Sequence, residues 1–221
     1  MNWKKRLLSG FRLYVVIDTK ILGARNLSLV ARSLALNGAG IIQLRDKDCS
    51  RYQLLEYARD LRKAVDGLPV ISIINDYTDI ASIAECDGIH LGQEDTSIES
   101  ARDILGKDKI IGISCHNLKE AEEAQDKGAD YIGLGPVFNT TTKPGCPPIN
   151  QEIIAKVIRK IKVPVFVIGG INRCNIGRLI QMGAQRLALC QAILGGGNIV
   201  ENTRYFRGLT KGPVSCSLNL N

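Results

Sequence analysis

The feature that most constrains the fold is a series of short apolar runs, each followed by a longer stretch with helical spacing. The runs are rich in Val and Ile, which favour strands. Strands that alternate with helices imply right-handed crossovers and a parallel sheet that is covered on both faces. We therefore expect strands at Leu13–Ile17, Gly40–Leu44, Val70–Ile74, Gly88–Leu91, Ile110–Ser114, Tyr131–Leu134, Val165–Ile168 and Arg186–Leu189.

Eight such units in 221 residues favour a closed α/β barrel of the (β/α)8 or TIM type, which typically has about 200–250 residues. A doubly wound open sheet is the alternative. We expect helices over Ser50–Val65, Asn117–Lys127 and Gln151–Lys160, and the first residues of the second have the pattern of a capped helix start. Gly-Ala pairs before three of the strands, at Gly38, Gly128 and Gly183, indicate a repeated helix end closed by glycine.

No linker or low-complexity segment divides the chain. We expect one barrel over residues 1–207 that includes a short amphipathic lead-in, and a flexible tail over residues 208–221, which lack periodicity. No run approaches the roughly 18 apolar residues of a membrane span, so we expect no membrane association.

The net charge of +7 is spread along the chain, and only 5% of the residues are aromatic. A nucleic-acid-binding stripe is therefore not expected, and small anionic molecules are the favoured partners. The seven cysteines include no Cys-x-x-Cys pair, and two histidines do not complete a zinc site with them. This composition is typical of reduced thiols in a cytoplasmic protein. The sequence leaves the oligomeric state open, a homo-oligomer included.

In a (β/α)8 barrel the active site lies where the strands end. The second predicted strand ends in Gln43-Leu44-Arg45-Asp46-Lys47. Alternation along the strand directs Gln43, Arg45 and Lys47 into the barrel mouth, where two cations require an anion. The alternative is an ion pair between Arg45 and Asp46 at the edge of the loop.

Carboxylates follow the third and fourth predicted strands, in Asn75-Asp76 and Gly92-Gln93-Glu94-Asp95. Two carboxylates on neighbouring strand ends suit Mg²⁺ that takes its remaining ligands from substrate phosphates. Alternatively, Asp76 and Asp95 cap the helices that follow them.

The loop after the sixth strand, Asn139–Gly145, combines hydroxyls, a lysine and glycine, which together suit a phosphate. Such a loop can also be an ordinary polar turn. The seventh strand leads into Gly169-Gly170 and the eighth into Cys190-Gln191, the positions where this barrel commonly binds phosphate.

Three further polar residues are weaker candidates. His90 lies within a strand and could simply satisfy a hydrogen bond in the core. Ser114 and His116 suggest a Ser–His pair, but no Gly-x-Ser-x-Gly elbow surrounds them, so a nucleophilic serine is not expected. Cys115 and Cys190 are expected to be packing residues. Two anion sites and a metal site without a nucleophile suit the departure of a pyrophosphate.

Together, these segments resemble the thiamine phosphate synthase family (thiamine-phosphate pyrophosphorylase), from about Leu13 to Leu194. The resemblance implies a Mg²⁺-dependent transferase that condenses 4-amino-2-methyl-5-(diphosphooxymethyl)pyrimidine with thiazole phosphate, or its carboxylated form. The products are thiamine phosphate and pyrophosphate, formed through a pyrimidine-methylene cation. The resembling motifs are Gln43–Lys47, Ile74–Asp76, Gly88–Asp95, Gly112–Ser114, Gly135–Lys143 and Ile168–Ile171.

The resemblance also implies a role for each site residue. The small phosphorylated pyrimidine and its pyrophosphate are held by Gln43, Arg45, Lys47 and Asn75. Mg²⁺ is carried by Asp76 and Asp95. The departing pyrophosphate is bound by Ser114 and Lys143, which act in catalysis with Arg45 and Lys47. The phosphate of the thiazole is bound by Thr140, Thr142, Gly170, Cys190 and Gln191.

Two residues depart from the family pattern, which has arginine where this chain has Tyr77 and serine where it has Gln191. They put the affinity for thiazole phosphate in question more than the pyrophosphate chemistry. The alternatives are a thiazole tautomerase of the same fold and a non-catalytic paralogue that binds phosphorylated ligands. Gln93, Asp95 and Pro136 favour the synthase over the tautomerase.

Overall fold

The computed structural model describes residues 7–140 and 145–210. Its eight parallel strands close into a barrel in the order in which they occur in the chain, so the predicted (β/α)8 barrel is confirmed and the open sheet is wrong. Each predicted strand is present, with ends that shift by one residue at most. The strands are β1 Leu13–Asp18, β2 Ile41–Arg45, β3 Ile71–Asn75, β4 Gly88–Leu91, β5 Ile110–Cys115, β6 Tyr131–Leu134, β7 Val165–Ile168 and β8 Leu187–Leu189.

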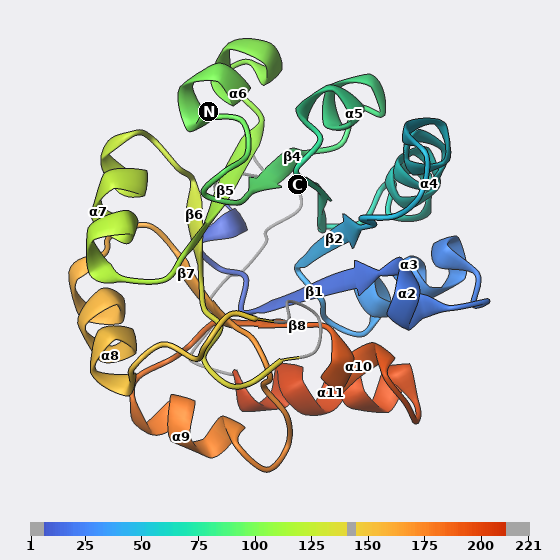
Figure 1. Cartoon of the computed structure of the whole chain (residues 1–221). Helices are drawn as coiled ribbons and strands as arrows, with labels where there is room; N and C mark the ends of the chain where they lie inside the picture. Colours follow the sequence, from blue (N-terminus) through green and yellow to red (C-terminus); the bar gives the residue numbers. More distant parts are fainter. Residues whose placement is uncertain (1–6, 141–144, 211–221) are drawn as a thin grey trace, which may run out of the picture.

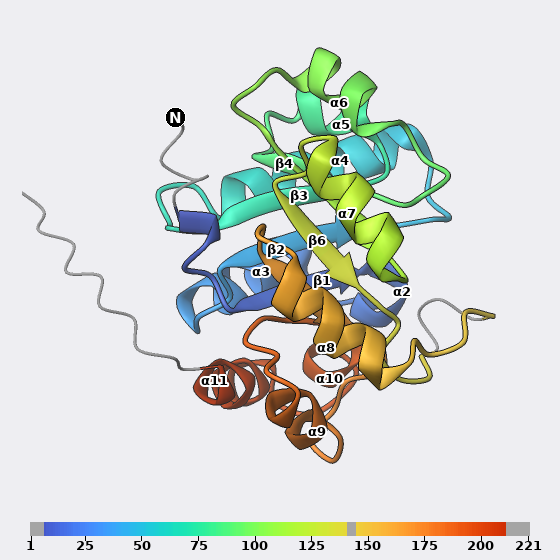
Figure 2. The same ribbon diagram turned by 90° about the vertical axis from the view of Figure 1, so that its left-hand side faces the viewer.

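The helices surround the barrel (Figure 1), and α7 and α8 lie side by side on its outside (Figure 2). Apolar residues on the inner side of each helix and on the outward side of each strand form one continuous core between the two layers. The helices are α2 Thr19–Leu22, α3 Leu27–Leu36, α4 Arg51–Ala64, α5 Thr78–Ile83, α6 Ile98–Leu105, α7 Leu118–Asp126, α8 Gln151–Lys160, α9 Ile176–Gln181, α10 Gln191–Leu194 and α11 Ile199–Leu209.

The local signals for helix ends act as the sequence predicts. Asn117 caps α7, since its side chain accepts a hydrogen bond from the backbone N–H of Glu120. The glycines that follow α3, α7 and α9 adopt φ values of 105°, 86° and 91°. Side chains disfavour this left-handed region, so glycine is suited to turning the chain back toward the next strand.

A second, smaller core fills the inside of the barrel. Alternation along each strand sends every other residue inward, and these residues include three rings, Tyr14, Tyr131 and Phe166. The rings meet edge to face, with centroids 5.5 to 5.7 Å apart. Leu8 and Phe11, from the predicted lead-in before β1, pack against the same cluster.

At the end of the chain, α11 continues to Leu209, and residues 211–221 of the expected tail lie outside the described residues. The division of the chain near residue 207 stays a prediction. None of the described helices is both long enough and apolar enough to cross a bilayer.

Candidate active site

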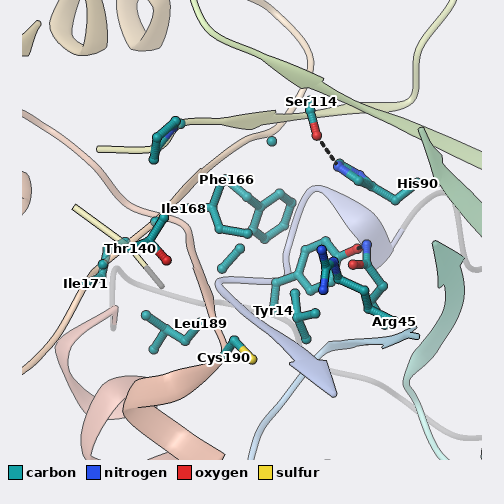
Figure 3. Close-up of a pocket in the computed structure, with 18 of the residues that line it drawn as sticks. Tyr14, Arg45, His90, Ser114, Thr140, Phe166, Ile168, Ile171, Leu189 and Cys190 are labelled. Carbon is teal, nitrogen blue, oxygen red and sulfur yellow. Dashed lines mark hydrogen bonds between the residues drawn. The ribbon is translucent and has the colours of Figure 1, made fainter. Parts of the chain in front are cut away.

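A cavity of 410 Å³ lies at the C-terminal ends of the strands (Figure 3). The rings of Tyr14 and Phe166 are among the side chains that line it. Two of the predicted site residues, Thr142 and Lys143, lie outside the described residues. The others all line the cavity, namely Gln43, Arg45, Lys47, Asn75, Asp76, Asp95, Ser114, Thr140, Gly170, Cys190 and Gln191.

Arg45 forms its ion pair with a residue that the sequence analysis did not identify. Its guanidinium donates to the carboxylate of Asp18, which stands directly opposite it in the β1–β2 register. The Asp18 side chain is only 4% exposed, so the pair is largely shielded from water. Asp46 instead accepts a hydrogen bond from the Thr19 hydroxyl. The expected alternative of an Arg45–Asp46 pair is therefore wrong.

Lys47 and the carboxylates of Asp76 and Asp95 form a compact charged group. The ammonium of Lys47 donates to Asp76, and the carboxyl groups of Asp76 and Asp95 adjoin each other closely enough to affect each other's pKa. Asp95 also accepts a hydrogen bond from the backbone N–H of Gly92, at 2.6 Å. The carboxyl ends of β3 and β4 thus bring the two predicted metal ligands together.

Burial raises the pKa of Asp76, and the contact with Asp95 raises it further, against the opposing charge of Lys47. Burial acts in the same direction on Asp95, but the hydrogen bonds from Asp76 and Gly92 outweigh it, so the pKa of Asp95 is lowered. Two adjoining carboxylates repel each other unless a proton or a cation lies between them. This pair is therefore suited to an added cation.

Neither carboxylate is a helix cap, so that alternative is wrong. The residue before α5 is Tyr77, which provides no side-chain cap, and α6 is capped by Ser97. Asp76 instead adopts a φ of 64°, a left-handed conformation that Asp tolerates better than most residues. Such a conformation is often found at functional sites.

The described residues contain no cluster of three or more His, Cys, Asp or Glu side chains that could enclose a metal. A cation at Asp76 and Asp95 would therefore complete its coordination with water or with oxygens of a bound phosphate. This pattern of few protein ligands is typical of Mg²⁺ and unlike that of structural zinc. The donor set fits the predicted magnesium site.

Ser114 pairs with a different histidine from the one that the sequence suggested. Its hydroxyl lies 3.0 Å from Nε2 of His90 (Figure 3), whereas His116 pairs with Glu120. The backbone carbonyl of Ser114 accepts a hydrogen bond from Gln93. His90 is also bonded through Nδ1 to the hydroxyl of Tyr131, at 3.0 Å, so the expectation of a satisfied core histidine is confirmed.

The loops after β6 and β7 approach each other very closely at Gly170. A Cβ at this position would lie 2.1 Å from the carbonyl oxygen of Asn139, and the residue has a φ of 63°. Only glycine avoids both the steric clash with the carbonyl oxygen and the strain of a positive φ. The contact holds Thr140 and Gly170 on the same rim of the cavity.

The last strand contributes Cys190 and Gln191. Burial raises the pKa of the Cys190 thiol to about 12, so it remains protonated and is no thiolate nucleophile. Cys115 is buried, as expected of a packing residue. The amide of Gln191 folds back over Gly195, where a Cβ would lie 2.1 Å from its Nε2.

Comparison with known proteins identifies the family. The sequence model described as thiamine monophosphate synthase matches residues 13–193. The chain belongs to the thiamine monophosphate synthase family. It is 40% identical over 200 residues to the thiamine-phosphate synthase of Halalkalibacterium halodurans, an alignment that covers 90% of this chain and 95% of that protein. It is 38% identical over 200 residues to the enzyme of Syntrophomonas wolfei, with 90% and 96% covered.

Solved structures agree with this assignment. A thiamine phosphate pyrophosphorylase from Pyrococcus furiosus superimposes with a TM-score of 0.82 at 32% identity, over 95% of this chain and 98% of that one. A 3-hexulose-6-phosphate synthase, at 18% identity and a TM-score of 0.65, shares the fold alone. Like its thiamine monophosphate synthase relatives, the chain is a transferase of thiamine biosynthesis.

Tyr77, one of the two residues that depart from the expected family pattern, has an arginine of another helix close by. The guanidinium of Arg51, on α4, stands over the ring of Tyr77 with its Cζ 5.2 Å from the ring centroid. Arg51 also pairs with Asp79. A cation is thus held beside Tyr77.

The sequence did not indicate a functional role for some of the residues in and around the cavity. Asp18 directly follows the predicted strand Leu13–Ile17, so the rule applied to the other strand ends would have found it. Tyr14, Tyr131 and Phe166 lie inside strands, where alternation marks them as inward-facing but does not distinguish packing from function.

Proposed function

We propose that this chain condenses the aminopyrimidine methyl pyrophosphate with thiazole phosphate at the mouth of its barrel, in a Mg²⁺-dependent reaction. The observation that carries the proposal is the convergence of two cations, two touching carboxylates and a glycine-rich rim on one cavity. Opposite charges arranged in this way suit a substrate whose pyrophosphate leaves from the carbon that then bonds to a phosphate-bearing partner.

Arg45 and Lys47 are proposed to bind the pyrophosphate of the pyrimidine substrate, with Gln43 and Asn75 near its ring. Asp18 holds the Arg45 guanidinium in place, so the cation does not need to be ordered when the substrate binds. The NH2 group of Gln43 already donates to Tyr14 at 2.6 Å, which leaves its carbonyl oxygen for a substrate donor.

Asp76 and Asp95 would hold Mg²⁺. When bound, the ion would neutralise negative charge on the pyrophosphate and so make it a better leaving group. Lys47 contacts Asp76 and lies beside the same group, so the ammonium and the carboxylates together define where the pyrophosphate oxygens can lie. Asp76 directly follows β3 and has a left-handed backbone conformation, with a φ of 64°.

Charge develops on the oxygen of the leaving group as the carbon–oxygen bond breaks. The Ser114 hydroxyl lines the cavity and can donate to that oxygen, and Lys143, which lies outside the described residues, is proposed to do the same. The site requires no general base, because the nitrogen of the thiazole captures the pyrimidine-methylene cation directly. Positioning and charge neutralisation therefore supply most of the catalysis.

Thiazole phosphate is proposed to bind at the other rim, with its phosphate near Thr140, Thr142, Gly170, Cys190 and Gln191. Glycines allow backbone N–H groups to reach the phosphate oxygens. The Gln191 amide, which lines the cavity, lies against Gly195.

Several other expectations stay predictions. They are a cytoplasmic location, reduced thiols, a barrel boundary near residue 207 and the formation of a homo-oligomer.

The test is to incubate purified protein with both substrates and Mg²⁺, and to measure thiamine phosphate as fluorescent thiochrome after oxidation. A parallel sample contains EDTA, and a third replaces thiazole phosphate by its carboxylated form. Product that requires the metal supports the proposal. Folded protein that makes no product, but isomerises the carboxylated thiazole, would identify a tautomerase instead.

A further inference from the structure

A continuous chain of hydrogen bonds links five residues, four of which line the cavity, and ends at Ser114. Gln43 Nε2 lies 2.6 Å from the hydroxyl of Tyr14, which lies 2.9 Å from the hydroxyl of Tyr131. Tyr131 is 3.0 Å from His90 Nδ1, and His90 Nε2 is 3.0 Å from the Ser114 hydroxyl. The first four side chains are at most 9% exposed, so water does not interrupt the chain.

The chemistry of these groups gives the chain a direction. An amide NH2 can only donate, so the Tyr14 oxygen is the acceptor of the bond from Gln43. Among the described residues, the acceptor within reach of the Tyr14 proton is the Tyr131 oxygen. Tyr131 then has its own proton left for Nδ1 of His90. Burial raises the pKa of both tyrosines, so each keeps the single proton that it passes along.

The direction of these hydrogen bonds determines the tautomer of His90 and the orientation of the Ser114 hydroxyl proton. A histidine that accepts at Nδ1 carries its hydrogen on Nε2 when neutral, and Nε2 therefore donates to the Ser114 oxygen. The hydroxyl proton of Ser114 must then point away from His90, toward the cavity that Ser114 lines. This orientation makes the serine a donor to an anion before any substrate arrives.

We propose that Tyr131, supported by Tyr14, is a positioning residue that fixes the tautomer of His90 and thereby presents Ser114 as a hydrogen-bond donor to the leaving pyrophosphate. The inference deepens the proposed function and rests on it, since it assumes that Ser114 contacts the pyrophosphate. Neither tyrosine needs to touch the reacting atoms.

Ring packing holds Tyr131 in this hydrogen-bonded chain (the relay) independently of the hydrogen bonds themselves. The Tyr131 ring stacks on the His90 ring, with centroids 5.5 Å apart and an angle of 26° between the planes. The Tyr131 ring also fills the space beside Gly112, where a Cβ would lie 2.0 Å from Cζ of the ring. Tyr131→Phe therefore removes the hydroxyl while the ring keeps its contacts.

The first test reads the tautomer directly, by NMR of protein with ¹⁵N-labelled histidine at a pH where the imidazoles are neutral. The chain has only two histidines, so a His116→Gln variant assigns the His90 signals. We expect a protonated Nε2 and a bare Nδ1 in the wild-type protein, and a mixture of tautomers in Tyr131→Phe. A proton on Nδ1 in the wild type, or an unchanged tautomer in the variant, would overturn the inference.

The second test compares steady-state kinetics. Tyr131→Phe should lower kcat about tenfold, the scale expected for losing one directed hydrogen bond in a buried network, with little change in either KM. Tyr14→Phe should have a smaller effect, because Tyr131 still donates to His90. Tyr52→Phe, on the surface of α4 with the residue 73% exposed, is the matched control and should behave as wild type.

A double variant separates failure of the relay from failure of the proposed function. If the tyrosine acts through the serine, Tyr131→Phe should lower kcat little further in a Ser114→Ala background. Ser114→Ala with undiminished kcat would refute the role of the serine itself. The relay alone would be refuted if Ser114→Ala lowers kcat and Tyr131→Phe lowers it by its full factor again in the double variant.

Discussion

The carboxylate of Asp18, at the end of β1, binds the guanidinium of Arg45, at the end of β2, and the two residues are opposite each other in the parallel register. The pair explains how an arginine can stand at the inward edge of an apolar barrel, because the buried carboxylate neutralises its charge. It also means that an incoming pyrophosphate meets a guanidinium that is already oriented.

Asp18→Asn should therefore raise the KM for the pyrimidine pyrophosphate about tenfold, because the neutral amide holds the guanidinium less firmly. Steady-state kinetics with thiazole phosphate in excess measure this. The control is Asp66→Asn, which breaks the surface pair between Arg62 and Asp66 on the outside of the barrel. Surface pairs contribute little, so this control should not change KM. An equal effect in both variants would contradict the assigned role of Asp18.

The carboxylate pair predicts an unusual dependence of stability on pH. The folded-state pKa of Asp76 is raised, so its stabilising contribution is complete below its ordinary pKa and is lost as the pH rises through the folded value. At pH 7 the metal-free protein therefore carries a destabilising charge. Asp76→Asn should raise Tm by about 2–4 °C at pH 7, and the difference should vanish below about pH 4.

Thermal denaturation of the two proteins in EDTA, at a series of pH values, checks this. Asn is the better replacement than Ala because it also tolerates the φ of 64°. A variant that is less stable than the wild type at pH 7 would mean that the bond to Lys47 outweighs burial and repulsion.

Metal binding should reverse the destabilisation that the charged Asp76 carboxylate causes at pH 7. Mg²⁺ together with pyrophosphate should raise the Tm of the wild-type protein, since a ligand that binds only the folded state stabilises it. Asp76→Asn and Asp95→Asn should each lose most of this increase. Asp79→Asn, which removes a carboxylate of α5 that pairs with Arg51 of α4, is the control and should respond as wild type. An equal Mg²⁺ response in all four proteins would place the metal elsewhere.

The close contact between the loops after β6 and β7 predicts the effect of a single methyl group. Gly170→Ala would push against the Asn139 carbonyl and force a left-handed alanine, so we expect the KM for thiazole phosphate to rise more than about tenfold. Gly177→Ala is the matched control, because a Cβ at Gly177, in α9, meets nothing within 4 Å. It should leave the kinetics unchanged. A similar KM in both variants would show that this rim does not bind the thiazole.

The sequence was sufficient for the barrel because every strand carries its own local signal. Apolar β-branched runs mark the strands, and glycines such as Gly128 mark the helix ends, so neither depends on distant contacts. The candidate site follows from one rule, that residues leaving the strands meet at one end of the barrel.

Pairing between side chains was less predictable, because it depends on register. The strand alternation placed Arg45 inward, but only the β1–β2 register selects Asp18 rather than the adjacent Asp46 as its partner. Likewise, His116 is closer to Ser114 in sequence, yet β4 and β5 bring His90 to it. Lys143 lies outside the described residues, and its role stays a prediction.

The most direct measurement of the central claim is the molar ratio of thiamine phosphate to pyrophosphate formed by the wild-type protein with both substrates and Mg²⁺. The proposed reaction predicts equal amounts of the two products, and neither in EDTA. Pyrophosphate without thiamine phosphate, or no product from folded protein, would contradict the assignment of this cavity as a synthase site.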